Sequence, residues 1–280
     1  LVISGRVRRA LILVPKSVMK QWQEELYEKF ALNIPRYDGG ALRDVFERDV
    51  PWSGESVWSA CPLLLASSQL AKRRERQGEV LAAQPWDLVI LDEAHHARRR
   101  DFQDDRYRPN RLLELLAGSE GKPGLKDRTR CLYLLTATPM QVNPVEVWDL
   151  LKALGLGGKW GALQDHFLKF FGELRRSFNE RDWPFILDMA RDDLATGGVI
   201  EPAFAEAAQQ ELGLVDWDIV RELPNSSKPG TIIAQLGRKQ QGWLHELVRR
   251  CTPLRRFMWR NTRRLLRQYR EKGLLSENVP

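Results

Sequence analysis

Two adjacent carboxylates give the chain its strongest chemical signal. Asp92 and Glu93 stand directly after an apolar run, and an alanine and the pair His95-His96 follow them. A carboxylate at such a strand end can hold Mg²⁺, directly or through water, because hard cations bind oxygen ligands. Its neighbour points in a different direction and can orient and deprotonate a water molecule. The sequence therefore predicts a metal-holding role for Asp92 and a general-base role for Glu93.

The same residues also allow plainer interpretations. An acidic pair alone is most often a solvated turn after a strand. The pair His95-His96 is either exposed or one half of a metal site, and no third ligand stands at a suitable spacing. We therefore discount a histidine-bound metal.

A second motif favours the catalytic interpretation of the first. The apolar run 131–135 ends in Thr136-Ala-Thr138-Pro139. The two hydroxyls can hydrogen-bond the carboxylates or His95, and Pro139 fixes the direction in which the chain leaves. By itself this would be an ordinary strand-to-turn sequence. After an earlier strand that ends in two carboxylates, it predicts one shared site, with His95 as the link.

Four short apolar runs are predicted to be the strands that carry these motifs. Each is apolar throughout rather than alternating, as in parallel strands with helices on both faces. They are residues 10–14, 63–67, 88–91 and 131–135. Helical spacing of apolar residues follows at 16–30 and 144–154. Alternating strands and helices predict an α/β fold with a doubly wound parallel sheet.

The rest of the chain has a different character. Residues 98–130 are charged and rich in Gly and Pro, which predicts a loop excursion from the sheet. The C-terminal half has helical patterns, apart from a weak strand-like run at 231–234. We therefore predict a sheet-bearing domain at 1–157 and a mainly helical appendage at 158–280.

Composition indicates the kind of partner and the cellular compartment. The 280 residues are 43% hydrophobic with a formal net charge of +7, and a basic balance favours a polyanionic partner. Three widely spaced cysteines indicate neither a disulfide framework nor a zinc site, and favour a reducing cytosol. The sequence shows no run long enough for a membrane helix and no signal-peptide pattern. It starts like the tail of a longer element, which predicts a fragment of a larger protein.

The order of the motifs resembles superfamily-two helicases and translocases, whose signature pair is Asp-Glu-Ala-His followed by Thr-Ala-Thr-Pro. Flanking segments are similar to those of Swi/Snf-type ATPases, including bacterial RapA-like members. These segments are 10–15 with Gln21-Trp22 (motif Ia), 63–70 (motif Ib), 138–143 with Glu146 and Asp149 (extended motif III), and the arginine-rich 255–263. The resemblance runs over residues 1–155 and 253–270, and 158–250 match no known segment.

The resemblance implies a RecA-like first motor lobe that uses ATP and Mg²⁺. The family's catalytic positions fall on Asp92, Glu93, His95, Thr136 and Thr138. The segments that line its nucleic-acid track include Pro15, Lys16 and Ser67. The implied parent protein is cytoplasmic and couples ATP hydrolysis to movement along double-stranded DNA. Its nearest resemblance is to prokaryotic members, some of which belong to phage-defence systems.

One departure from the family pattern limits this expectation. The phosphate-binding loop Gly-x-x-x-x-Gly-Lys-Thr is absent, as is the second motor lobe. We expect both in the parent protein, and no ATP hydrolysis by these 280 residues alone. An RNA helicase, a restriction-complex motor and a non-catalytic nucleic-acid or protein-binding module stay open as alternatives.

The segment 249–272 holds most of the C-terminal positive charge. On a continuous helix its arginines would gather broadly along one side, where they could contact a phosphate backbone. The candidates for this contact are Arg256, Arg260 and Arg263. A solvated helix, or a brace paired with acids of the second lobe, would give the same pattern.

Overall fold

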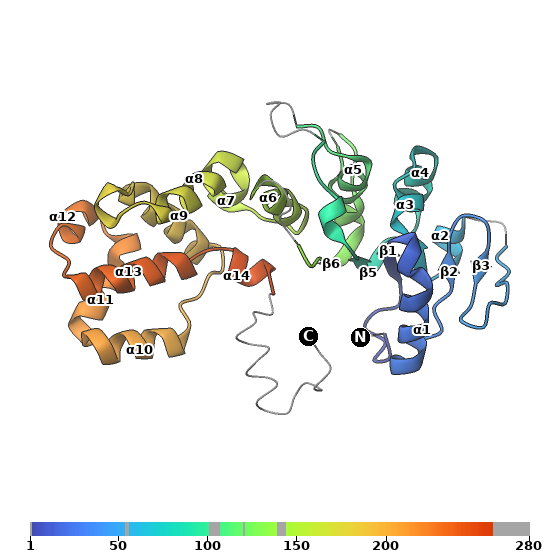
Figure 1. The fold of residues 1–280 in the computed structure, drawn as a ribbon, viewed down its shortest axis with the longest axis horizontal. Helices are drawn as coiled ribbons and strands as arrows, with labels where there is room; N and C mark the ends of the chain where they lie inside the picture. Colours follow the sequence, from blue (N-terminus) through green and yellow to red (C-terminus); the bar gives the residue numbers. More distant parts are fainter. Residues whose placement is uncertain (1, 54–55, 101–106, 120, 139–143, 260–280) are drawn as a thin grey trace. The chain divides into compact units, whose positions relative to one another are not determined.

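The computed structural model describes residues 2–53, 56–100, 107–119, 121–138 and 144–259. The chain divides into two compact units, Leu1–Leu156 and Gly157–Pro280, called unit 1 and unit 2 here. Unit 1 contains a sheet with helices, and the described part of unit 2 contains helices and no strand (Figure 1).

The six strands of unit 1 form one sheet in the order β3-β2-β4-β1-β5-β6. Every neighbouring pair is parallel except the antiparallel pair β2 and β3. The strands are β1 (Ala10–Val14), β2 (Arg36–Tyr37), β3 (Leu42–Arg43), β4 (Leu63–Ser67), β5 (Trp86–Leu91) and β6 (Thr129–Leu134). The predicted α/β class is confirmed. The sequence missed β2 and β3 because two residues are too few to show a periodic pattern.

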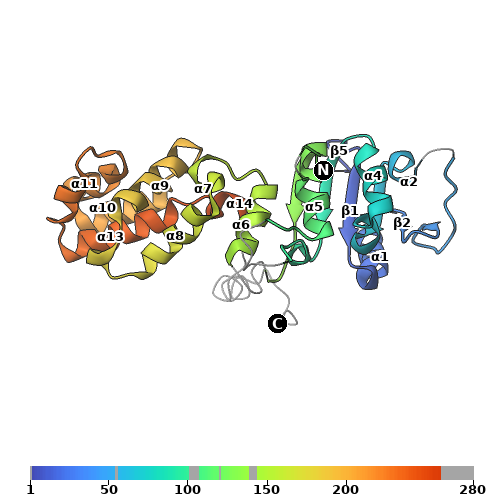
Figure 2. The same ribbon diagram turned by 90° about the horizontal axis from the view of Figure 1, so that it is seen from above.

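Helices cover both faces of the middle of this sheet, whereas the edge strand β6 is largely exposed (Figure 1, Figure 2). Successive side chains of β1 point to opposite faces, so Leu11 and Leu13 enter a larger core while Ile12 and Val14 enter a smaller one. Helix α1 (Met19–Phe30), which follows the short 3-10 helix Lys16–Val18, covers the smaller core. The larger core takes side chains from α2 (Val57–Ala60), α3 (Ser68–Ala71), α4 (Arg74–Ala82), α5 (Arg111–Ala117) and α6 (Pro144–Ala153).

The predicted loop excursion after β5 contains ordered structure. A 3-10 turn, Ala94–His96, follows β5. Two backbone hydrogen bonds of 2.9 Å then join residues 98–100 to 108–110. The side chain of Asn110 caps α5 by accepting hydrogen bonds from two backbone N–H groups at 3.1 and 3.0 Å. Its amide donates to the carbonyl of His96 at 2.7 Å, which fixes the excursion to the end of β5.

Unit 2 is built around buried aromatic and aliphatic side chains, among them Trp160, Phe170 and Trp217. The strand-like run at 231–234 was a wrong prediction, because residues 229–233 form a helix. Pro229 presets a helical φ at its start, and Ile233 is buried. The helices are α7 (Gly158–Ala162), α8 (Gln164–Arg175), α9 (Trp183–Ala195), α10 (Pro202–Leu212), α11 (Leu214–Glu222), α12 (Pro229–Ile233), α13 (Arg238–Arg250) and α14 (Leu254–Phe257). Among the described helices of both units, none has the length and apolar character needed to cross a bilayer.

Candidate active site

The parallel register brings the ends of β1, β5 and β6 to one edge of the sheet. Leu91, the last residue of β5, is paired with Leu13 of β1 and with Leu134 of β6. The residues that follow β5 and β6 therefore leave the sheet side by side. The backbone hydrogen bonds from Leu135 N to Leu91 O and from Ala94 N to Leu135 O, both 2.9 Å, continue this pairing past the strands.

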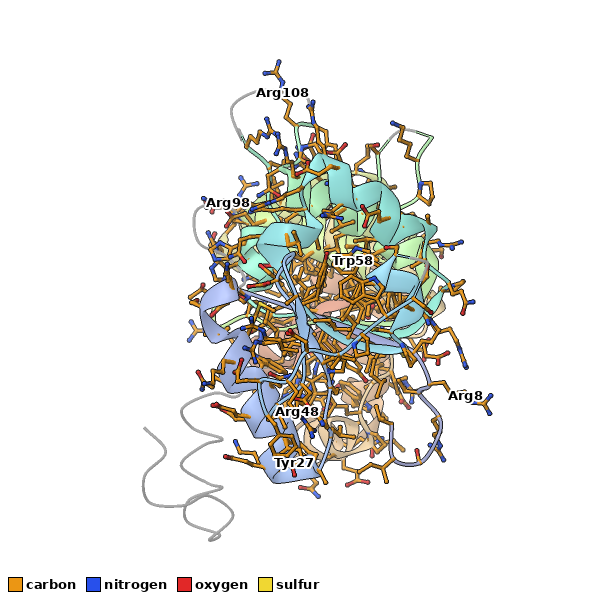
Figure 3. The ribbon with its side chains drawn as sticks, turned by 90° about the vertical axis from the view of Figure 1, so that its right-hand side faces the viewer. Arg8, Tyr27, Arg48, Trp58, Arg98 and Arg108 are labelled. Atoms are coloured by element: carbon orange, nitrogen blue, oxygen red, sulfur yellow. The ribbon has the colours of Figure 1, made fainter. Side chains whose placement is uncertain are left out.

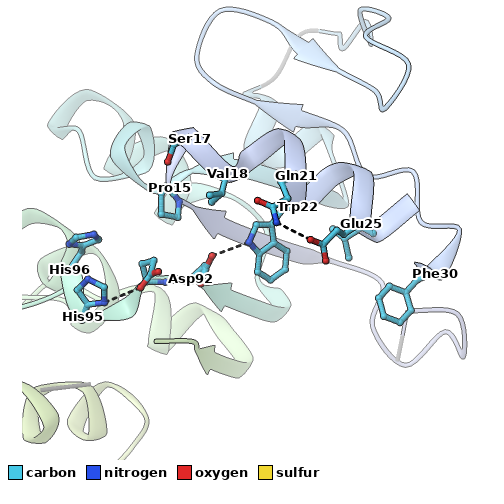
Figure 4. A pocket seen from close by; sticks show the side chains of 12 residues that line it. Pro15, Ser17, Val18, Gln21, Trp22, Glu25, Phe30, Asp92, His95 and His96 are labelled. Atoms are coloured by element: carbon cyan, nitrogen blue, oxygen red, sulfur yellow. Dashed lines mark hydrogen bonds and ion pairs between the residues drawn. The ribbon is translucent and has the colours of Figure 1, made fainter. Parts of the chain in front are cut away.

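Asp92 lies at this edge with both carboxylate oxygens engaged. Its Oδ1 accepts a hydrogen bond from the backbone N–H of Glu93 at 2.9 Å. Its Oδ2 accepts one from the indole Nε1 of Trp22, also at 2.9 Å (Figure 4). Because Trp22 belongs to α1, that helix sets the direction in which the carboxylate faces.

Glu93 has a left-handed backbone, with φ 51° and ψ 47°. This conformation costs a residue with a side chain roughly 1–2 kcal/mol, and such strain gathers at functional positions. Its side chain turns toward His95, so that Glu93 Oε2 lies 3.0 Å from His95 Nδ1. The atom Oε2 is buried, yet the approach of His95 lacks hydrogen-bond alignment, so a buried carboxylate oxygen is left without a donor.

His95 lies between the two motifs. Its Nδ1 is 3.1 Å from Thr136 Oγ1, and that hydroxyl oxygen accepts a hydrogen bond from the backbone N–H of Thr138 at 3.2 Å. The His95 side chain is only 11% exposed, which holds it in this position. The structure thus places four of the five predicted catalytic side chains together. Thr138 takes part through its backbone.

A cleft of about 610 Å³ opens beside these groups (Figure 4). Its polar end contains Asp92, Glu93 and the histidine pair, and its apolar side is formed by α1. Carboxylate oxygens facing such a cleft are the donors that Mg²⁺ prefers. The described residues contain no cluster of three or more His, Cys, Asp or Glu side chains able to hold a metal by themselves. A metal here would need ligands from its substrate as well.

His96 stacks against His95, with ring centroids 4.2 Å apart. Burial, and then the neighbouring His95, lowers the pKa of His96 below its ordinary value, against an opposing effect of Glu93. Burial thus disfavours the charged form of His96 at the acidic end of the cleft.

The predicted nucleic-acid residues lie at the ends of β1 and β4. The backbone N–H of Lys16 donates to Gln69 Oε1 at 3.0 Å, and the hydroxyl of Ser67 donates to the same oxygen at 2.9 Å. Ser67 is buried, so its hydroxyl shapes the strand end, whereas the Lys16 side chain is 69% exposed and near Asp38. Pro15 precedes Lys16 and lines the cleft.

The C-terminal arginines do not form the expected continuous helix within the described residues. Helix α13 ends at Arg250 and the short α14 begins after Pro253. Arg256 donates to the buried carboxylate of Asp193 at 2.7 Å and to the carbonyl of Thr196, so its guanidinium is engaged inside unit 2. Arg260 and Arg263 lie outside the described residues.

Two residues at the site were not singled out by the sequence for the roles they have. Trp22 was named only as part of the motif Ia segment, yet it donates to Asp92 from 70 positions away. Gln69 ties the ends of β1 and β4 together. Neither contact has a local sequence signal, because both depend on which strands become neighbours.

The comparisons with known proteins agree with this architecture. Residues 3–276 match the family of the SNF2-related domain, and the chain belongs to that family. It is 31% identical over 180 residues to a protein of Bacillus subtilis named as the uncharacterized ATP-dependent helicase YqhH, covering 64% of this chain and 26% of that protein. It is 34% identical over 143 residues to the RNA polymerase-associated protein RapA of Vibrio vulnificus, covering 51% of this chain and 13% of RapA. The chain thus spans about a quarter or less of the length of these relatives.

Among solved structures, the chain is similar to the SWI2/SNF2 ATPase core of Sulfolobus solfataricus in complex with double-stranded DNA. The TM-score is 0.40 at 16% identity, over 97% of this chain and 54% of that one. The resemblance to Swi/Snf-type, RapA-like proteins seen in the sequence motifs is confirmed by the family match and the relatives.

Proposed function

We propose that this chain is part of an ATP-dependent DNA translocase that couples ATP hydrolysis to movement on double-stranded DNA. The carrying observation is the group Asp92, Glu93, His95 and Thr136 at two neighbouring strand ends, in a chain of the SNF2-related family. The names of its relatives, an ATP-dependent helicase and RapA, support a nucleic-acid motor. The preference for duplex DNA rests on the Swi/Snf resemblance and on the net charge of +7.

In this proposal each residue has a separate task. Asp92, oriented by Trp22, holds the Mg²⁺ that accompanies ATP, and the bound ion supplies charge compensation for the phosphates. Glu93, whose carboxylate lines the cleft, orients the attacking water and accepts its proton. His95 contacts both Glu93 and Thr136. A movement of Glu93 would therefore be transmitted through His95 to Thr136 at the end of β6. The sequence contains no phosphate-binding loop, so this chain supplies only the metal and water side of the site.

The test is ATP turnover by the protein that contains this chain, with and without duplex DNA. We expect DNA to stimulate turnover, and Glu93→Gln to lower it by about 10²–10⁴-fold while leaving ATP binding intact, since the amide cannot accept the proton. Glu28→Gln is the matched control, because Glu28 is an exposed residue of α1 outside the cleft. Undiminished turnover in Glu93→Gln would remove Glu93 from its proposed task.

The substrate is tested separately. A duplex translocase should displace a third strand or a bound protein from duplex DNA without separating the two strands. Strand separation, or stimulation by RNA alone, would favour an RNA helicase instead. Absence of any nucleotide turnover in the longer protein would favour the non-catalytic binding module.

A further inference from the structure

A basic surface lies beside the candidate active site and has no part in the catalytic proposal. Its residues come from the corner between α3 and α4, and from the excursion that follows β5. We name it the arginine surface, and it consists of Lys72, Arg73, Arg74, Arg100, Arg108 and Arg111. Figure 3 shows Arg108 projecting outward, at the end of the view opposite Tyr27.

Hydrogen bonds hold the two segments of this surface together. The side-chain amide of Gln77 donates to the carbonyl of Lys72 at 3.2 Å and to the carbonyl of Arg111 at 3.0 Å. Between the segments lies a polar pocket of about 220 Å³, lined by Lys72, Arg98 and Asn110 together with Ser68 and Gln69. The pocket contains several hydrogen-bond donors in a space large enough for a phosphate group.

Four arginines of this surface lie outside the ion pairs that the described residues form. Arg73, Arg74, Arg100 and Arg111 are exposed, and none forms an ion pair with another described residue. By contrast, the nearby Arg76 and Arg99 are paired within the fold. Exposed, unpaired guanidinium groups are available for bidentate contacts with phosphate.

Three of these arginines stand where the fold itself disfavours them. Arg73 is the N-cap of α4, Arg74 is its first residue, and Arg111 is the first residue of α5. The positive end of the helix dipole lies there and favours acidic side chains over basic ones. Their charges therefore gain nothing from the helix dipole, which the acidic Glu75 and Glu114 of the same first turns complement.

The polar character of the arginine surface favours a phosphate backbone over a protein as its partner. Tyr107 is the one large hydrophobic side chain among the described residues of these segments that is exposed. A protein partner would need an apolar centre for its interface. A phosphate backbone is bound by cations and hydrogen-bond donors, and this surface presents both near the carboxyl edge of the sheet. Gln69, which lines the pocket, also accepts a hydrogen bond from the backbone of the exposed Lys16.

We propose that the arginine surface contacts the phosphate backbone of duplex DNA and extends the track formed by the ends of β1 and β4. This inference rests on the proposed function for its choice of partner. The proposed contacts come in part from the segment that follows the acidic pair. This segment begins near His96, whose carbonyl accepts a hydrogen bond from the Asn110 side chain. In the proposal, DNA bound at Arg100 would be connected to Glu93 through the short segment 94–99.

The experiment measures binding of the 280-residue chain to a fluorescently labelled duplex over a range of salt concentrations. The variant Arg73→Gln/Arg74→Gln/Arg111→Gln removes three cations of the surface. The matched control, Arg6→Gln/Arg8→Gln/Lys122→Gln, removes three exposed cations that lie outside the arginine surface and its pocket. Figure 3 shows Arg8 far from both Arg98 and Arg108.

Each lost phosphate contact lowers affinity about eightfold at 0.1 M salt and reduces the slope of log affinity against log salt by about 0.9. We expect the surface variant to bind at least about 50-fold more weakly, which corresponds to two lost contacts, and the control variant to change less than about threefold. The surface variant should also melt at the same temperature as the parent chain or slightly above it, because the unfavourable helix-end charges are gone.

Equal losses of DNA affinity in the surface variant and the control variant would show attraction by net charge alone and would overturn the proposal. An unchanged affinity of the surface variant would also overturn it, as would failure of the unsubstituted 280-residue chain to bind duplex DNA. Equally tight, equally variant-sensitive binding of an acidic polypeptide would assign the surface to a protein partner instead. The two proposals can be separated. If DNA stimulates ATP turnover but the surface variant binds DNA normally, the arginine surface is not a DNA contact, while the proposed motor function is still supported.

Discussion

The direction of the Asp92 carboxylate depends on one indole N–H. Asp92 is the first residue past β5, and its backbone N–H still donates to the carbonyl of Leu13 at 2.8 Å. The hydrogen bond from Trp22 adds a restraint on the side chain, from a helix packed on the sheet. A residue that holds a metal ligand in place usually affects metal affinity more than it affects the fold.

Replacing Trp22 with phenylalanine tests this contact, because an aromatic ring stays in place while the N–H donor is lost together with the five-membered ring that carries it. In the protein that contains this chain, we expect Trp22→Phe to raise the Mg²⁺ concentration needed for half-maximal ATP turnover about tenfold. Trp52→Phe, at an exposed tryptophan outside the cleft, should leave the Mg²⁺ dependence unchanged. An unaltered Mg²⁺ dependence in Trp22→Phe would show that the indole contributes packing only.

At the scale of elements, a buried ion pair connects the two motif-bearing segments. Arg99, which follows the acidic motif, donates two hydrogen bonds of 2.8 Å to the carboxylate of Asp149 in α6, which follows the threonine motif. The side chains are only 11% and 2% exposed, and the Arg99 guanidinium also lies over the ring of Tyr107. Burial raises the pKa of Asp149, while Arg99 opposes that effect, so the ionised carboxylate depends on its partner.

Removing one charge of this pair should therefore be costly. We expect Asp149→Asn to destabilise unit 1 by about 3 kcal/mol, which lowers the melting temperature by about 6–12 °C, because Arg99 is left buried without a counter-charge. The double variant Arg99→Met/Asp149→Leu should regain most of that loss, since it leaves no unpaired buried charge. Glu24→Gln, which breaks an exposed helix pair with Lys20, should cost less than about 0.5 kcal/mol. Equal effects of Asp149→Asn and Glu24→Gln would contradict a buried, stabilising pair.

The elements also show what the sequence could reveal. All four strands predicted from apolar runs are present. Every residue of β1 is buried, as expected where helices cover both faces, whereas no residue of the edge strand β6 is fully buried. The short strands β2 and β3 escaped detection, and the weak strand-like run noted at 231–234, in a half predicted to be helical, lies largely within α12, which Pro229 starts. Local propensity is a weak guide where a proline or tertiary packing decides the outcome.

At the scale of the whole molecule, the candidate site could be predicted as far as topology determines it. Parallel strands place their carboxyl ends at one edge, so the proximity of the acidic and threonine motifs followed from their positions after strands. The partners of individual side chains did not follow. Trp22 and Asp92 are 70 positions apart, and Arg256 and Asp193 are 63 apart, and only the packed fold brings such groups together.

In unit 2, this last pair changes how the C-terminal arginines are understood. Arg256 connects α14 to the end of α9 through Asp193, whose carboxyl is buried and has its pKa raised mainly by that burial. A phosphate contact by Arg256 would require this ion pair to open. The arginine surface of unit 1 offers exposed cations without that cost.

The central claim is that the acidic motif and the threonine motif face one metal-bound triphosphate. The experiment supplies Fe²⁺ in place of Mg²⁺, together with hydrogen peroxide and ascorbate. The peroxide is reduced by Fe²⁺ to hydroxide and a hydroxyl radical, which would cut the polypeptide next to a bound ion, and ascorbate reduces the Fe³⁺ that is formed. With ATP present, we expect cuts at two separate places, within residues 92–96 and within 134–138, and loss of both cuts in Asp92→Asn. Cleavage at only one of these segments, or at neither, would contradict a shared site.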